Sequence, residues 1–257
     1  LEAIDAIARA RRFGSAGDRF IIEDRLQGQE ASILAITDGR TILTLPPAQD
    51  HKRVGEGDTG PNTGGMGAYS PAPVVTHEIY QRIMDEVINP TISGMAKEGY
   101  PYTGFLYAGL MIMADGTPKV IEYNCRFGDP ETQPIMLRLK SDIVPLCQAA
   151  CKGELAGKTI EFDERASVGV VLAAGGYPGS YDKGDVITGF EEAAKLDGKV
   201  FHAGTALQGG DVVTAGGRVL CATALGNNVT EAQQKAKDEA EKIKAQLEEA
   251  GAQVEVK

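Results

Sequence analysis

The feature that most constrains the fold is a ten-residue apolar run, GFLYAGLMIM, at residues 104–113. The turn sequence ADGT follows it, and then a second strand-like run, PKVIEYN, at residues 118–124. Two such runs around a tight turn predict an antiparallel hairpin. Because the first run lacks polar alternation, we expect its strand to be covered on both faces.

A second hairpin is predicted nearer the start of the chain. The runs EASILAIT and TILTLPP are joined through Asp38-Gly39, a dipeptide that favours a hairpin turn. Before it, residues 1–13 have the apolar spacing of a short amphipathic helix, and FIIED reads as the beginning of a strand. The chain begins at Leu1, inside this helix-like run, so we expect it to be part of a longer one.

Three helices are predicted around the hairpins. Thr76 should cap the first, and Pro90 should kink or divide it. Pro134 suits the first turn of the second helix, and the third spans residues 141–151.

The texture of the chain changes near Gly157, where short strand-like runs between glycine turns begin. One helix, at residues 230–250, ends this region. Thr230 and Gln233 fit a capping box, and Gly251 fits a C-cap. We therefore expect a domain boundary near residue 160.

Composition limits the class of protein. The net charge of −10 argues against a broad surface for nucleic acid. No apolar run approaches the roughly 20 residues of a membrane span, and there is no signal peptide with a basic start. The four cysteines form no C-x-x-C pair, so we expect reduced, buried thiols in a cytoplasmic protein.

Gly55, Gly57 and Gly60 match the pattern G-x-G-x-x-G. A dinucleotide-binding fingerprint must leave a strand and open a helix. This one lies inside a loop and runs into Pro61-Asn62, so we reject a dinucleotide site here.

Polar residues gather where the second hairpin ends. Alternation along a strand puts Glu122 and Asn124 on one face, and Arg126 joins them if the strand persists. An acid and an amide so spaced can present oxygens to Mg²⁺, and a guanidinium can neutralise a transferring phosphoryl group. A salt-bridged strand end is the alternative. Asp129 and Glu131 in the next turn favour a site.

A second group of polar residues lies at FIIEDRLQGQEAS. A segment crossing from Glu23 and Asp24 to Leu26 can offer backbone groups to an adenine edge, and Glu30 can bind ribose hydroxyls. Taken alone, solvated acids beside a turn are the simpler interpretation.

Residues 49–73 form a long stretch rich in glycine, with the adjacent cations Lys52 and Arg53. Such a loop can cradle a sugar phosphate, and Asp50 and Asp58 could orient an amine or ammonium group. A mobile loop without function is the alternative.

Three motifs together resemble the phosphoribosylamine–glycine ligases, also called glycinamide ribonucleotide synthetases, of the ATP-grasp superfamily. They are DHKRVGEGDTGPNTGGMGAYSPAP at residues 50–73, NCRFGDPETQ at 124–133 and AAGGYPGSY at 173–181. The resemblance runs from about residue 20 to the end of the chain. It implies an ATP-dependent ligase that joins glycine to 5-phosphoribosylamine, with ADP and phosphate as the other products.

The resemblance also implies roles for single residues. Glu122 and Asn124 match the Mg²⁺ or Mn²⁺ ligands, and Arg126 matches the arginine that faces the transferring phosphate. The stretch from Glu23 through Asp24 to Leu26 matches the connection beside adenine, and Glu30 matches the acid that binds ribose. The glycine and phosphoribosylamine side is implied for Asp50, Lys52, Arg53, Asp58, Asp129 and Glu131.

The implied fold is α+β: an ATP-grasp catalytic domain, an antiparallel sheet with flanking helices, plus a small C-terminal α/β domain. We expect residues 1–35 to be a remnant of the lid subdomain and nucleotide hinge, 36–160 the catalytic domain and 161–257 the C-terminal domain. We expect a monomer. The family's glycine-rich lid motif is not in this sequence, so we expect weak ATP binding and little turnover by this chain alone. Another ATP-grasp ligase, a biotin-dependent carboxylase subunit and a non-catalytic fragment are the alternatives.

Overall fold

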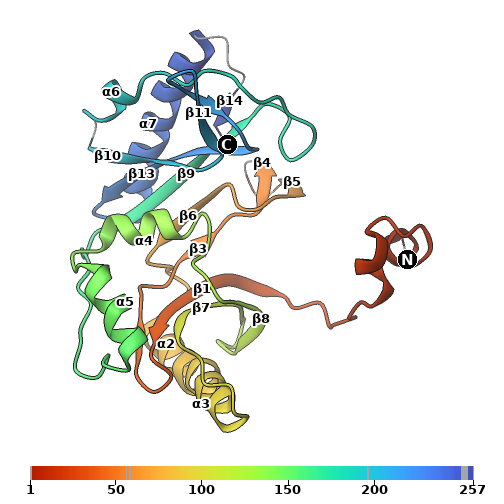
Figure 1. Ribbon diagram of the computed structural model, residues 1–257, viewed down its shortest axis with the longest axis vertical. Helices are drawn as coiled ribbons and strands as arrows, with labels where there is room; N and C mark the ends of the chain where they lie inside the picture. The colour runs from red at the N-terminus through yellow and green to blue at the C-terminus, as the bar shows by residue number, and fades with distance from the viewer. Residues whose placement is uncertain (1, 56, 58, 196, 250–253, 257) are drawn as a thin grey trace.

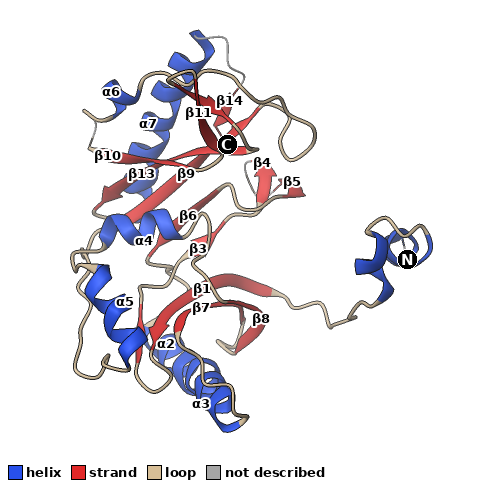
Figure 2. Cartoon of the chain, viewed as in Figure 1, coloured by secondary structure: helices blue, strands red, loops and turns tan. Residues whose placement is uncertain are grey.

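The computed structural model describes residues 2–55, 57, 59–195, 197–249 and 254–256. Two layered sheets form the body of the molecule, and the N-terminal segment lies apart from them (Figures 1 and 2). That segment contains short helical pieces: α1 (Glu2–Ile4), η1 (Asp5–Arg9) and η2 (Gly14–Asp18).

An extended stretch, residues 19–27, leads from η2 to the first sheet (Figure 1). The prediction of a strand at FIIED is wrong, because none of the strands that the structure describes pairs with this stretch. Ile21 and Ile22 are instead 85% and 77% exposed.

The first sheet is antiparallel, in the order β2-β1-β7-β8. Its strands are β1 (Gly28–Thr37), β2 (Ile42–Thr44), β7 (Gly104–Met113) and β8 (Pro118–Asn124). Both predicted hairpins are confirmed by the β1–β2 and β7–β8 pairings. The central strand β7 is largely buried on both faces, as its unbroken apolar run predicts.

Helices α2 (His77–Ile83), η3 (Met84–Ile88) and α3 (Asn89–Lys97) cover one face of this sheet (Figure 1). Thr76 caps α2 by accepting a hydrogen bond from the backbone N–H of Ile79, which confirms the predicted start. Pro90 lies in the first turn of α3, after a π-helical segment, so the long helix is divided there as expected.

The opposite face packs at one end against α4 (Thr132–Arg138) and α5 (Ile143–Lys152). Leu34 and Ile135 lie in one core cluster there, and Ile36 and Leu146 lie in the next. Toward Gly28 the same face carries polar side chains.

The second sheet has the order β10-β13-β9-β6-β3, and β14 also pairs with β9. Its strands are β3 (Gln49–Asp50), β6 (Gly67–Ser70), β9 (Ala166–Ala174), β10 (Gly198–His202), β13 (Arg218–Gly226) and β14 (Val254–Val256). Two further hairpins are formed by β4 (Arg53–Gly55) with β5 (Thr59–Asn62) and by β11 (Thr205–Gln208) with β12 (Asp211–Thr214).

Residues 49–73 therefore form four short strands rather than the long loop expected from their composition. The reason is tertiary: β6 pairs with β9, which follows it by about a hundred residues. The boundary near residue 160 remains a prediction, and the second sheet takes strands from both sides of it.

The long helix α7 (Val229–Glu249) packs on β9 and β13, and α6 (Phe190–Ala193) lies beside it. The N-terminal cap of α7 differs from the prediction. The side chain of Asn228, not Thr230, accepts the N–H of Glu231, whose carboxylate in turn accepts the N–H of Asn227. The predicted C-cap, Gly251, lies outside the described residues.

Strand β8 is the outer strand of its sheet, so Val120, Ile121 and Tyr123 are each about 40% exposed. The prediction of buried thiols is wrong for two of the four cysteines. Among the cysteines, Cys125 and Cys151 are exposed and only Cys221 is fully buried. In the part of the chain that the structure describes, no helix is long and apolar enough to cross a membrane.

Candidate active site

The face of the first sheet that looks toward the second sheet carries polar groups from three strands. In an antiparallel ladder, residues opposite one another share a face. Ser32 and Glu122 both lie opposite Gly109, and Asn124 lies opposite Tyr107. The register therefore gathers Glu30, Ser32, Tyr107, Glu122 and Asn124 on one face.

The carboxylate of Glu131 meets this face; Glu131 directly precedes α4 and is 3% exposed. Its Oε1 accepts hydrogen bonds from the hydroxyls of Ser32 and Tyr107, each at 2.9 Å. Burial, together with the nearby carboxylate, raises the pKa of the Tyr107 phenol far above its ordinary value. Tyr107 therefore stays a hydrogen-bond donor at any physiological pH.

Lys52 joins the loop after β3 to strand β1. Its Nζ donates to Oε2 of Glu30 at 2.8 Å. Burial, the largest single influence, disfavours the ammonium, but the bond to Glu30 and the charges of Asp50, Glu30 and Glu122 together outweigh burial and raise the pKa of Lys52. For Asp50, burial and then the charge of Glu131 raise the pKa to about 6, and Lys52 opposes them.

These side chains enclose a narrow cleft lined by Glu30, Asp50, Lys52, Tyr107 and Glu122, among others. The side chain of Glu122 lies against Gly109: a Cβ added to Gly109 would be 3.3 Å from the Cγ of Glu122. Three carboxylates and one ammonium line this cleft, and Glu131 adds a further carboxylate beneath it. The excess of negative charge suits a divalent cation or a substrate ammonium group.

The amino-acid sequence of the chain has known relatives. Residues 1–132 match the family described as "Phosphoribosylglycinamide synthetase, ATP-grasp (A) domain", and residues 167–249 match its C domain.

The chain belongs to the phosphoribosylglycinamide synthetase family.

Curated relatives in this family are phosphoribosylamine–glycine ligases. That of Vibrio vulnificus (strain YJ016) is 63% identical over 243 residues, which is 95% of this chain and 57% of the relative. That of Pseudomonas aeruginosa is 63% identical over 242 residues, which is 94% of this chain and 56% of the relative. The chain thus spans little more than half the length of these synthetases.

Solved structures agree with this assignment. Phosphoribosylamine–glycine ligase from Thermotoga maritima has a TM-score of 0.70 at 38% identity, covering 91% of this chain and 55% of that one. L-amino acid ligase from Bacillus licheniformis has a TM-score of 0.56 at 15% identity, covering 91% and 55%, a likeness of fold alone. The predicted α+β class and ATP-grasp fold are confirmed.

Some residues that the synthetase resemblance assigns to the site lie elsewhere. Glu23 and Asp24 are exposed in the extended stretch before β1, and Leu26 is half-buried there. Strand β8 ends at Asn124, so Arg126 does not continue its polar face; its guanidinium donates to the carbonyl of Phe127 at 2.7 Å. Asp58 lies outside the described residues.

Arg53 and Asp129 also point away from the cleft. Arg53 donates to the carbonyl of Gly60 at 2.6 Å, within the β4–β5 hairpin. Asp129 pairs with Arg218 of β13, with 3.1 Å between its Oδ2 and Nη2. The same guanidinium donates to the carbonyls of Gly64 and Asp129, each at 2.8 Å.

Sequence reasoning missed Ser32, Tyr107 and Arg218. A polar residue in a strand predicted to be buried must find a partner, so Ser32 and Tyr107 carried a usable signal. The sequence gives no comparable signal for Arg218, because its hydrogen-bond partners lie 89 and more positions earlier in the chain.

Proposed function

We propose that the protein is an ATP-dependent C–N ligase that joins glycine to 5-phosphoribosylamine, giving glycinamide ribonucleotide, ADP and phosphate. The observation that carries this proposal is the 63% identity to phosphoribosylamine–glycine ligases over 95% of the chain. The acid-rich cleft of the first sheet supports it, because it offers charge complementary to a metal ion and to an ammonium group.

Glu122 and Asn124 are the proposed ligands of Mg²⁺ or Mn²⁺. The donor set fits, since a carboxylate and an amide oxygen share one face at the end of β8 and Mg²⁺ accepts one or two carboxylates beside nucleotide phosphates and water. The bound ion would supply charge neutralisation between the phosphates during transfer. Among the described residues no group of three or more His, Cys, Asp or Glu could hold a metal, so water and ATP would complete the coordination.

The reaction requires activation of a carboxylate. An oxygen of glycine attacks the γ-phosphorus of ATP, ADP leaves, and a glycyl phosphate results. The nitrogen of phosphoribosylamine then attacks the carbonyl carbon, loses a proton and expels phosphate. Positioning matters more here than a side-chain nucleophile.

The chain's own residues would position these groups. Asp50 is the proposed partner of the glycine ammonium, close to Lys52 in the cleft. Glu30 is proposed to bind the ribose hydroxyls, with the stretch from Glu23 through Asp24 to Leu26 beside adenine. Arg126 would turn from its present contact with Phe127 toward the transferring phosphoryl group.

The phosphoribosylamine side is proposed to involve Lys52, Arg53, Asp58, Asp129 and Glu131. Of these, Glu131 would act as a fixed, buried carboxylate, since Ser32 and Tyr107 already occupy its Oε1. We further propose a cytoplasmic monomer without nucleic-acid or membrane partners, divided into domains at residues 35 and 160.

A direct test measures ADP release by the protein as its gene encodes it, with ATP, Mg²⁺ and freshly generated 5-phosphoribosylamine. Glycine should support turnover, and alanine, aspartate and bicarbonate should not. Turnover with one of these in place of glycine would favour another ATP-grasp enzyme. Absence of turnover with all of them would favour a non-catalytic role.

A further inference from the structure

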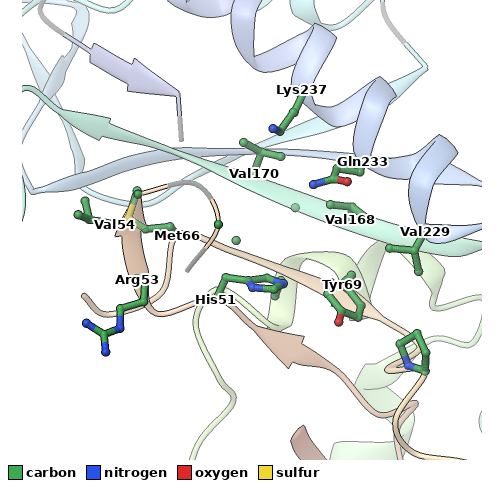
Figure 3. A pocket seen from close by; sticks show the side chains of 16 residues that line it. His51, Arg53, Val54, Met66, Tyr69, Val168, Val170, Val229, Gln233 and Lys237 are labelled. Atoms are coloured by element: carbon green, nitrogen blue, oxygen red, sulfur yellow. The ribbon is translucent and has the colours of Figure 1, made fainter. Parts of the chain in front are cut away.

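The 49–73 segment lines two separate spaces. Figure 3 shows His51 and Arg53 beside a cavity of about 630 Å³ between the second sheet and helix α7. Their neighbours Asp50 and Lys52 line the acid-rich cleft instead. This segment is already part of the proposed substrate region. A different part of the cleft is formed where strands β7 and β8 pair.

Gly109 interrupts the apolar run of β7, the central strand of the first sheet. It lies between Ala108 and Leu110, both fully buried. A glycine inside a strand weakens the strand, and it often marks a place where a ligand or another segment approaches closely. The φ angle of Gly109 is outside the left-handed region, so alanine could adopt the same backbone conformation. Space, not backbone conformation, is therefore what glycine provides at this position.

Two side chains use the space over Gly109. A Cβ added there would lie 3.3 Å from the Cγ of Glu122 and 3.4 Å from the Cε1 of Tyr107. Contacts this short require a neighbour to move by a few tenths of an ångström. Tyr107 is buried and bonded to Glu131, whereas Glu122 is exposed and can yield. A side chain at position 109 would therefore change the direction of the Glu122 carboxylate.

A β-bulge at the same place also acts on Glu122. Gly109 pairs with Glu122. The next pair joins Leu110 to Val120, so Ile121 is an extra residue in β8. Although they are adjacent in the strand, Ile121 and Glu122 both line the cleft. Bulges beside functional sites redirect side chains in this way.

We propose that Gly109 is a positioning residue for the metal site and acts through Glu122. Its missing side chain leaves the space that the Glu122 side chain occupies, and the bulge at Ile121 turns Glu122 into the cleft. This inference rests on the proposed role of Glu122 as a ligand of Mg²⁺ or Mn²⁺, so the two are tested side by side.

The test is Mn²⁺ binding by the protein as its gene encodes it, with a non-hydrolysable ATP analogue present. Electron paramagnetic resonance measures free Mn²⁺, and the analogue without protein is the blank. Gly109→Ala should raise the Kd for Mn²⁺ about tenfold, as is usual when a group that orients a metal ligand is altered. Gly94→Ala adds the same methyl group where no atom lies within 4 Å, and should leave the Kd unchanged. Wild-type Mn²⁺ affinity in Gly109→Ala would overturn the proposal.

Glu122→Ala in the same assay tests the metal role itself. If Glu122→Ala binds Mn²⁺ as the wild type does, the metal role of Glu122 fails and the proposal for Gly109 fails with it. If Glu122→Ala binds Mn²⁺ more weakly and Gly109→Ala does not, the metal role stands and only the proposal for Gly109 fails.

The double variant Gly109→Ala/Glu122→Ala shows whether Gly109 acts through Glu122. It should bind Mn²⁺ no more weakly than Glu122→Ala, because the side chain that the new methyl group displaces is gone. A further loss of affinity would overturn the proposal. If Gly109→Ala alone does not fold, thermal unfolding of the double variant decides. A folded double variant supports the collision with Glu122, and an unfolded one overturns it by placing the conflict elsewhere in the sheet.

Discussion

The guanidinium of Arg218, on β13, binds Asp129 twice: it pairs with the Asp129 carboxylate and donates a hydrogen bond to the Asp129 carbonyl. Asp129 lies in the turn before α4. The same guanidinium holds the carbonyl of Gly64. A residue of the C-terminal region thereby holds two loops together. Because Glu131 follows Asp129 by two residues, these contacts of Arg218 also help to position the buried carboxylate of Glu131.

Replacement of Arg218 should loosen both loops. We expect Arg218→Ala to lower the free energy of unfolding by about 1–3 kcal/mol, since four backbone and side-chain acceptors lose their donor, and to lower the rate of ADP formation. Urea unfolding and the ADP assay check this. Arg165→Ala is the control: its pair with Asp163 is local and the Arg165 side chain is 45% exposed against 22% for Arg218, so its effect should stay below about 1 kcal/mol.

Loss of the proposed metal ligand should stop the reaction and leave the fold intact. We expect Glu122→Ala to reduce ADP formation more than about 100-fold, because a bound ion is needed to neutralise the transferring phosphates, with an unchanged circular dichroism spectrum. Glu161→Ala, also at an exposed acid, should behave as the wild type. Near-normal turnover of Glu122→Ala at ordinary Mg²⁺ would remove Glu122 from the metal site.

The buried hydrogen bonds of Glu131 should contribute measurably to stability. We expect Tyr107→Phe to lower the free energy of unfolding by about 1–3 kcal/mol, because a buried carboxylate oxygen loses one of its donors. Tyr123→Phe deletes an exposed hydroxyl that contacts Thr91 and should cost less than about 0.5 kcal/mol. Equal losses in the two variants would argue against a special role for Tyr107.

Glu239 should make stability depend on pH. It is 3% exposed on α7, its Oε1 has no hydrogen-bond partner in the described part of the chain, and burial raises its pKa from 4.5 to about 7. Between these values the folded state holds a proton that the unfolded state has lost. The free energy of unfolding therefore falls as the pH rises through this window.

Glu239→Gln should remove that fall and stabilise the protein at pH 8 by about 2–3 kcal/mol. Thermal unfolding between pH 4.5 and 8 measures it. The exposed Glu241→Gln is the matched control and should leave the pH profile unchanged. A parallel profile for wild type and Glu239→Gln would show that Glu239 titrates normally.

Much of the local structure followed from the sequence. The two hairpins, the cap at Thr76 and the division of the helix at Pro90 depend on neighbours a few residues apart, so short motifs predict them. Alternation likewise put Glu122 and Asn124 on one face. The strand expected at FIIED failed for the complementary reason, since apolar residues form a strand only where another strand pairs with them.

The candidate site could be predicted only as separate pieces. The sequence offered Glu30, Asp50, Lys52, Glu122 and Glu131 as polar residues on different segments. Their approach to one another depends on β1, β7 and β8 pairing in one register and on Lys52 reaching Glu30 from the loop after β3. Burial then sets their properties, as the raised pKa of Asp50 illustrates.

The sequence by itself determined the family, the hairpins and the residue types available for catalysis, because these are recorded in contiguous motifs. Only the tertiary structure decided that His51 and Arg53 turn away from Asp50 and Lys52, and that Arg218 closes on Asp129. The physical reason is that a strand's two faces become different environments only when other elements pack against them.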